Sequence, residues 1–153
     1  MLFRSIGGTS SARLPARVRE KEGLSYSTYS YLNAGALDAA GTFGLSSIYA
    51  PQNRQRVENA IREELARALD KGFSDAEIEA AKKGLLETRL LQRSRDSGIA
   101  GRLSTYLFLG RTFDWDIDFE KRIAALAPTQ VRDALRRHID PKKLSVLKAG
   151  DFK

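Results

Sequence analysis

Apolar residues recur at helical spacing along most of the chain, and glycine, proline or capping residues bound each such stretch. Val57, Ile61, Leu65 and Leu69 recur every four residues and predict an amphipathic helix. Signals of the same kind set the ends of this helix at Pro51 and Lys71. They also predict a helix that ends at Gly7-Gly8, one that Thr9 or Ser10 caps and that ends at Gly23, and one that starts at Ser74, breaks at Ser97-Gly98 and resumes as far as Gly110. Two shorter helices are predicted near 119–126 and 128–138.

Two neighbouring stretches near the N-terminus have the period of β-strands instead. Residues 26–33 are rich in β formers, residues 33–36 have the composition of a turn, and residues 37–46 alternate with apolar side chains on one face. A last strand is expected at 144–150. This order predicts an α+β fold, with helices packed on one face of a mainly antiparallel sheet. Because no repeat or linker interrupts the chain, we expect residues 1–153 to form a single domain.

The composition is that of an ordinary globular domain with a basic bias. Hydrophobic residues make up 42% of the chain and charged residues 29%. No apolar run approaches the roughly 20 residues that cross a bilayer, so no membrane partner is expected. Lys and Arg exceed Asp and Glu by 26 − 19 = 7, but the two signs are interleaved. The chain has no cysteine, which excludes disulfides and thiolate metal sites.

No set of residues has the spacing of a catalytic metal or nucleotide site. A catalytic zinc needs about three protein ligands, whereas His138 is the single histidine. Its position favours an interaction with a helix C-terminus. Residues 114–118 resemble the opening of a calcium loop, but Phe119 and Ala125 stand where that loop requires Gly and Glu. We therefore expect these aspartates to favour the start of a helix, and we expect no phosphate-binding loop.

One short region carries the pattern of a known family. Residues 10–14 read Ser-Ser-Ala-Arg-Leu, and residues 18–27 read Val-Arg-Glu-Lys-Glu-Gly-Leu-Ser-Tyr-Ser. This pattern resembles the non-catalytic half of the pitrilysin, insulinase and mitochondrial processing peptidase family of zinc metallopeptidases. In that family, an arginine and a tyrosine seven positions apart reach across to a zinc site on another domain. The resemblance therefore makes Arg19 and Tyr26 the candidate substrate-binding residues.

The resemblance implies half of a metallopeptidase-like clamshell, in which the other half carries the H-x-x-E-H motif and the zinc. No such motif occurs here, so we expect no catalytic residue and no metal in this chain, which alone should be inactive. The expected function is the substrate-binding half of a zinc metallopeptidase that hydrolyses peptides. Its expected partners are a peptide substrate and a zinc-bearing catalytic domain, in the same chain or another, in the periplasm or cytoplasm of a bacterium.

Members of that family begin with a strand and a full helix before the position of Gly7-Gly8, and both are absent from this sequence. A sheet that lacks a strand exposes an unpaired edge. We therefore expect the chain to be less stable than a complete domain and to favour a homodimer.

Several alternatives remain beside the peptidase interpretation. The chain could be an inactive partner or assembly module of a peptidase-like complex. Arg19 could simply pair with Glu20 or Glu22, with Tyr26 at the rim of the sheet. A nucleic-acid site is less favoured; it would use arginines of one helical region with aromatic neighbours. Those arginines are Arg89, Arg93, Arg95, Arg102 and Arg111, and the aromatic residues are Tyr106, Phe108, Phe113 and Trp115.

Overall fold

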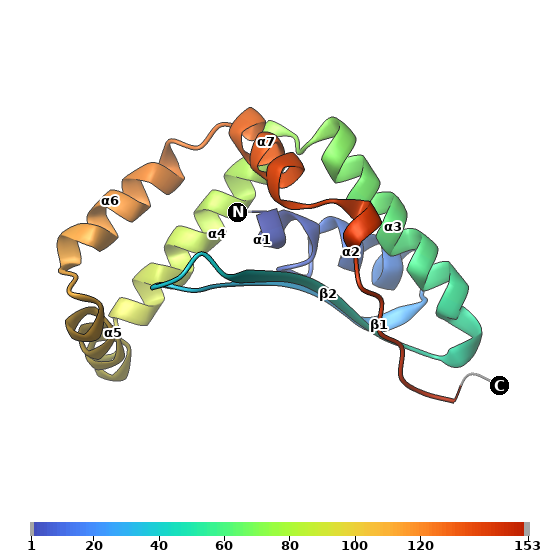
Figure 1. The fold of residues 1–153 in the computed structure, drawn as a ribbon, viewed down its shortest axis with the longest axis horizontal. Helices are drawn as coiled ribbons and strands as arrows, with labels where there is room; N and C mark the ends of the chain where they lie inside the picture. The colour runs from blue at the N-terminus through green and yellow to red at the C-terminus, as the bar shows by residue number, and fades with distance from the viewer. Residues whose placement is uncertain (1, 152–153) are drawn as a thin grey trace.

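The computed structural model of the chain describes residues 2–151, and it is mainly helical around one β-hairpin (Figure 1). Its elements are α1 (Leu2–Ile6), α2 (Arg13–Pro15), the π-helix η1 (Ala16–Lys21), β1 (Ser25–Ala34), β2 (Gly41–Tyr49), the 3-10 turn η2 (Pro51–Asn53), α3 (Arg54–Lys71), α4 (Asp75–Arg93), α5 (Asp96–Leu109), α6 (Phe113–Ala124), α7 (Pro128–His138) and the 3-10 turn η3 (Pro141–Lys143).

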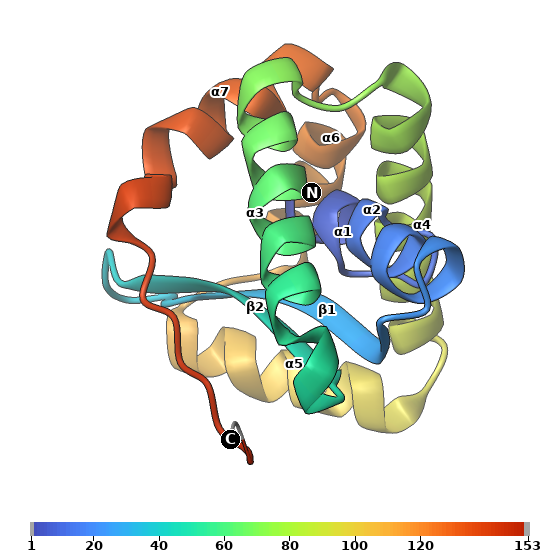
Figure 2. The same cartoon turned by 90° about the vertical axis from the view of Figure 1, so that its right-hand side faces the viewer.

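The two strands form a long antiparallel hairpin that curves beneath the N-terminal helices (Figure 1). Their pairing runs from Ser25 opposite Tyr49 to Ala34 opposite Gly41, with an irregularity between Ser25 and Ser27. Figure 1 shows α1, α2 and α3 on one side of the hairpin, and Figure 2 shows α1 and α2 above it with α3 passing in front. The predicted α+β fold, with helices on one face of an antiparallel sheet, is confirmed.

The core lies between the hairpin and these helices. Leu14 and Val18 are fully buried, as is Ile78 at the start of α4. α3 contributes the apolar face that its four-residue repeat predicts, with Val57 and Leu65 each 1% exposed. Because each such side chain contributes on the order of 1.5–3 kcal/mol when it is fully buried, this cluster is the main source of stability for the N-terminal half.

Several helix ends lie where the sequence predicts them. The Ser74 hydroxyl accepts a hydrogen bond from the backbone N–H of Glu77, and the Glu77 carboxylate accepts one from the backbone N–H of Ser74. This is the predicted capping box. α3 ends at Gly72, α5 ends at Gly110 and α7 spans the predicted residues 128–138.

Other boundaries differ from the prediction. Neither Thr9 nor Ser10 caps a helix, because a turn delays the helix to Arg13. The helix break lies at Ser94-Arg95 instead of Ser97-Gly98, since the backbone of Arg95 is extended. α6 begins six residues before Phe119, where the Thr112 hydroxyl accepts from the N–H of Asp114.

The two predictions for the strands after β1 also need correction. β2 begins at Gly41, not at residue 37, because the hairpin loop has no core beneath it and Leu37 is 75% exposed. The last strand predicted at 144–150 is wrong for the described part of the chain. Residues 144–149 have no regular structure. A strand needs a neighbouring strand to pair with, and within the described residues β2 pairs only with β1.

Candidate functional site

The segment that carries Arg19 is a π-helix, which is an uncommon element that often occurs at functional sites. The Glu22 N–H donates to the Arg17 carbonyl at 2.9 Å, and the Leu24 N–H donates to the Val18 carbonyl at 2.8 Å. Gly23 makes the turn between them with φ +60°, a value that favours glycine. This turn feeds directly into β1, so that the end of η1 and the start of the strand lie together.

The structure brings the two predicted site residues into contact. The guanidinium carbon of Arg19 lies 4.6 Å from the centroid of the Tyr26 ring, which is a cation–π contact. Tyr26 is 81% exposed. The Arg19 Nε also lies 3.3 Å from the Glu20 Oε1, so the local pairing with Glu20 coexists with the stacked arrangement. The Arg19–Tyr26 pair is therefore a surface contact that is accessible to solvent.

Two further tyrosines, which the sequence analysis did not single out, lie along the exposed face of β1. The ring centroids of Tyr29 and Tyr31 are 6.3 Å apart. Tyr31 pairs with Gly44 on β2, and a Cβ atom at Gly44 would come within 2.3 Å of the tyrosine ring. Gly44 thus lets the Tyr31 ring lie flat across the hairpin. The signal was present in the sequence, because Tyr29 and Tyr31 are two residues apart in a strand and share one face.

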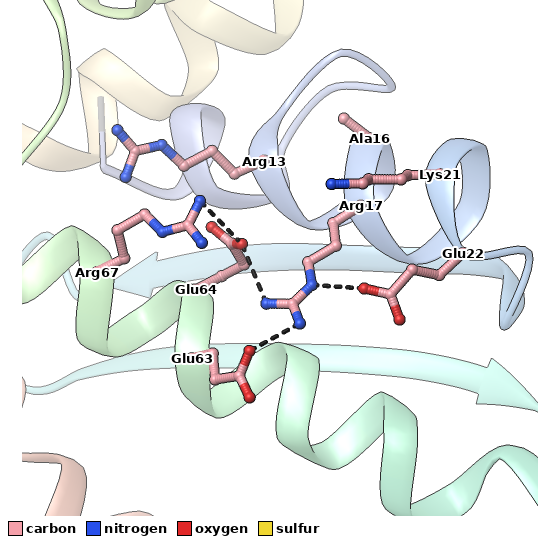
Figure 3. A pocket seen from close by; sticks show the side chains of 8 residues that line it. All are labelled: Arg13, Ala16, Arg17, Lys21, Glu22, Glu63, Glu64 and Arg67. Carbon is pink, nitrogen blue, oxygen red and sulfur yellow. Dashed lines mark hydrogen bonds and ion pairs between the residues drawn. The ribbon is translucent and has the colours of Figure 1, made fainter.

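An ion-pair cluster holds η1 against α3 (Figure 3). The Arg17 guanidinium donates to Glu22 and Glu63, each at 2.7 Å, and to the buried Glu64 at 3.3 Å. The hydrogen bond to Glu22, followed by the one to Glu63, raises the pKa of Arg17. Conversely, the hydrogen bond from Arg17 lowers the pKa of Glu22. Arg17 thereby joins η1 to α3, whose acidic residues lie directly opposite.

A second arginine anchors α2 to the start of α4. The Arg13 Nε and Nη2 donate to the two oxygens of Glu77 at 2.5 and 2.8 Å, and Nη2 also donates to the Gly72 carbonyl at 2.9 Å. The hydrogen bond from Arg13 is the main cause that lowers the pKa of Glu77 to about 2. Its guanidinium carbon lies 4.7 Å from the centroid of the Phe73 ring. Together, Arg13 and Arg17 hold the segment that presents Arg19.

The cavity beside these anchors has a volume of about 490 Å³ and is lined almost entirely by charged side chains (Figure 3). Its acidic residues are already paired with arginine, which disfavours a metal site there. Within residues 2–151, no group of three or more His, Asp and Glu side chains could hold a metal ion. His138 lies exposed at the end of α7. Among the described helices, none is long and apolar enough to cross a membrane.

Most of the arginines considered for nucleic acid have internal partners. Arg89 and Arg102 donate to the buried carboxylate of Asp116, Arg102 at 2.6 Å, and the Tyr106 hydroxyl donates to the same carboxylate. Arg93 donates to Glu120. Burial opposes the ionisation of Asp116, but these hydrogen bonds outweigh it and lower its pKa. Of the aspartates in residues 114–118, Asp116 is therefore the centre of an ion-pair network that joins α4, α5 and α6.

Comparisons with known proteins agree with the sequence pattern. The profile of the peptidase M16 inactive domain matches residues 1–85. An uncharacterised zinc protease of Streptomyces coelicolor is 32% identical over the whole chain, and a non-peptidase homologue of Helicobacter pylori is 26% identical over 92% of it. The chain spans about a third of the length of these relatives: 33% of the first and 32% of the second.

Solved structures show the same fold. The peptidase M16 inactive domain of Pseudomonas fluorescens matches 93% of the chain with a TM-score of 0.79 and 24% identity, over 34% of its own length. A protease from Helicobacter pylori matches 89% of the chain with a TM-score of 0.76 and 16% identity, over 32% of its own length. The family match and the fold together confirm the resemblance found in the sequence: the chain belongs to the M16 peptidase family and is an inactive domain of its zinc-protease-like proteins.

Proposed function

We propose that this chain is the substrate-contacting half of a zinc peptidase, with the catalytic half on another domain. The observation that carries the proposal is the exposed Arg19–Tyr26 pair, in which the Arg19 guanidinium carbon lies 4.6 Å from the Tyr26 ring centroid on a segment held by the ion pairs of Arg17, one of them to the buried Glu64. An exposed cation–π contact contributes only about 0.5–1 kcal/mol to stability, so stability alone does not explain why the segment that carries this pair is anchored so firmly.

The chemistry of the two side chains suits an extended peptide. The Arg19 guanidinium has several N–H donors for peptide carbonyl groups, and stacking on Tyr26 limits its orientations. The Tyr26 hydroxyl can donate to the oxygen of a scissile carbonyl as negative charge develops on it. The zinc of the other half would supply the activated water. The exposed rings of Tyr29 and Tyr31 extend the contact surface along β1.

Turnover by the longer native polypeptide, or by its complex with a zinc-bearing partner, tests the proposal. Tyr26→Phe should lower kcat by more than about tenfold, the scale of losing one oxyanion donor, with the zinc content unchanged. Tyr31→Phe is the matched control, because it keeps the aromatic ring that extends the contact surface and removes only a hydroxyl to which the proposal gives no role. Equal rates for the wild type and Tyr26→Phe would remove Tyr26 from the mechanism.

A second candidate is an inactive partner that binds a peptidase subunit without contributing to hydrolysis. It is favoured by the relative from Helicobacter pylori that is named a non-peptidase homologue. Turnover by the zinc-bearing native assembly separates the two candidates. A loss of turnover on Tyr26→Phe supports the substrate-contacting half, whereas turnover that survives both Tyr26→Phe and Arg19→Met supports the inactive partner.

A further inference from the structure

The strand that begins beside Tyr26 continues as an aromatic surface. Tyr29 and Tyr31 are 47% and 39% exposed, whereas Thr28 and Ser30, which alternate with them, are buried. Because side chains alternate across a strand, the buried residues point toward the helices that cover the hairpin, and the two tyrosines point away from those helices (Figure 1). We call the exposed rings of Tyr29 and Tyr31 the tyrosine surface.

The spacing of the two rings matches the spacing of side chains in an extended peptide. The ring centroids of Tyr29 and Tyr31 are 6.3 Å apart. In an extended peptide, side chains on the same face are two residues and therefore about 6.6 Å apart. The Tyr31 ring lies over Gly44, where a Cβ atom would overlap it, so the ring lies flat across the hairpin. An extended peptide along β1 can therefore place one side chain on each ring.

The surface around these rings has no formal charge. Neither β1 nor β2 contains Asp, Glu, Lys or Arg, although 29% of the chain is charged. A large apolar side chain can bind here without leaving a charge unpaired. The faces of aromatic rings carry partial negative charge, which disfavours a carboxylate. The nearby Arg19 guanidinium and the net charge of +7 disfavour a cation.

We propose that the tyrosine surface selects peptide substrates that carry large apolar or aromatic side chains at two positions, two residues apart. This inference rests on the proposed function, because it extends the substrate along β1 from the Arg19–Tyr26 pair. Tyr29 and Tyr31 follow Tyr26 by three and five residues, which is about 10 and about 17 Å along a strand. The selected side chains therefore lie about three and five residues from the scissile bond. Continuity with the Arg19–Tyr26 pair favours a substrate over a second copy of the chain as the occupant.

Peptide affinity tests the selection separately from hydrolysis. The native assembly is titrated into labelled peptides with zinc chelated, so that no peptide is cleaved, and binding is followed by fluorescence anisotropy. The probes are two Gly-Ser peptides of equal length and composition, with two phenylalanines either two or three residues apart. The first peptide should bind at least about threefold more tightly, because only its two rings share one face. A third peptide, with lysines in place of the phenylalanines of the first, should bind more weakly than the first.

Three variants of the native assembly locate the effect. Tyr29→Ala and Tyr31→Ala should each remove the preference for the first peptide, and both positions are exposed, so the fold is retained. Leu32→Ala is the matched control. Leu32 is 47% exposed, as Tyr29 is, but it points to the other face of the strand, so this variant should keep the preference.

Each other result overturns the selection. Equal affinity for the two phenylalanine peptides, or no binding of either, means that the rings do not select a substrate. A preference that survives both tyrosine variants places the apolar site elsewhere. Tighter binding of the lysine peptide would make the rings a cation site, and a preference that disappears as the protein concentration rises would identify a second copy as the occupant. If turnover falls on Tyr26→Phe while these affinities are equal, the proposed function stands and the selection alone fails.

Discussion

The two ends of this molecule are held together by different forces. Around η1 and α3, the buried side chains are mainly aliphatic, with Leu14, Val18 and Leu65 at 0–1% exposed, although Glu64 is buried as well. Between α4, α5 and α6, the most buried side chain is the carboxylate-bearing Asp116 at 3%, and its contacts are ionic. The first, mainly apolar end depends on its packed volume, whereas the ionic end depends on every partner being present. The candidate site lies on the apolar end.

Removing the centre of the ionic end should have the largest effect. Asp116→Ala leaves Arg89 and Arg102 without their shared carboxylate, and breaking a buried pair in this way costs about 3–5 kcal/mol. Urea unfolding measures the loss. The exposed Asp118→Ala is the control and should stay within about 0.5 kcal/mol of the wild type. A small loss for Asp116→Ala would mean that the helices of this end are held by other contacts.

A cavity in the apolar end should cost slightly less but should reach the site. Leu14→Ala removes a fully buried side chain and should lower the free energy of unfolding by about 3 kcal/mol. Because Leu14 lies between Arg13 and η1, tyrosine NMR signals should change at Tyr26. Asp116→Ala should leave those signals as they are. If both variants perturb Tyr26 equally, the two ends are a single cooperative unit and the comparison fails.

The sequence predicted the order of the elements better than it predicted their ends. Arg19 and Tyr26 lie together because a glycine turn joins the end of a helix to the start of a strand, and their role in substrate binding stays a prediction. The attachment of η1 to α3 was not predictable, since the Arg17 guanidinium pairs with Glu63 and Glu64, which lie 46 and 47 residues away in sequence. The strand at 144–150 was predicted from its composition alone. A segment with strand propensity forms a strand only where a neighbouring strand pairs with it, and no strand of the described residues pairs with this segment.

Acid should affect the anchor of α2 before it affects the aliphatic core. The pKa of Glu77 in the folded protein is about 2, below its ordinary value of 4.5. A carboxyl with a lowered pKa stabilises the fold above its unfolded pKa, and this contribution is lost as the pH falls through the folded value. Stability should therefore decrease as the pH falls from about 5 to about 2. Glu77→Gln should be less stable at neutral pH and should lose less over this range, as thermal unfolding at each pH will show. Equal pH dependence in both proteins would assign the acid sensitivity to other carboxylates.

The smallest effect on stability should come from the residue with the greatest proposed role. Arg19 and Arg17 lie on the same π-helix, but Arg17 has three carboxylate partners and Arg19 contacts the exposed Glu20 and Tyr26. Arg19→Met should change the free energy of unfolding by less than about 1 kcal/mol, since its contacts are exposed. Arg17→Met should cost more, because it leaves the buried Glu64 with one arginine partner fewer. Chemical denaturation of the two variants gives both values. An equal cost would make Arg19 a structural residue like its neighbour, and the simple pairing with Glu20 would then be sufficient to explain its presence.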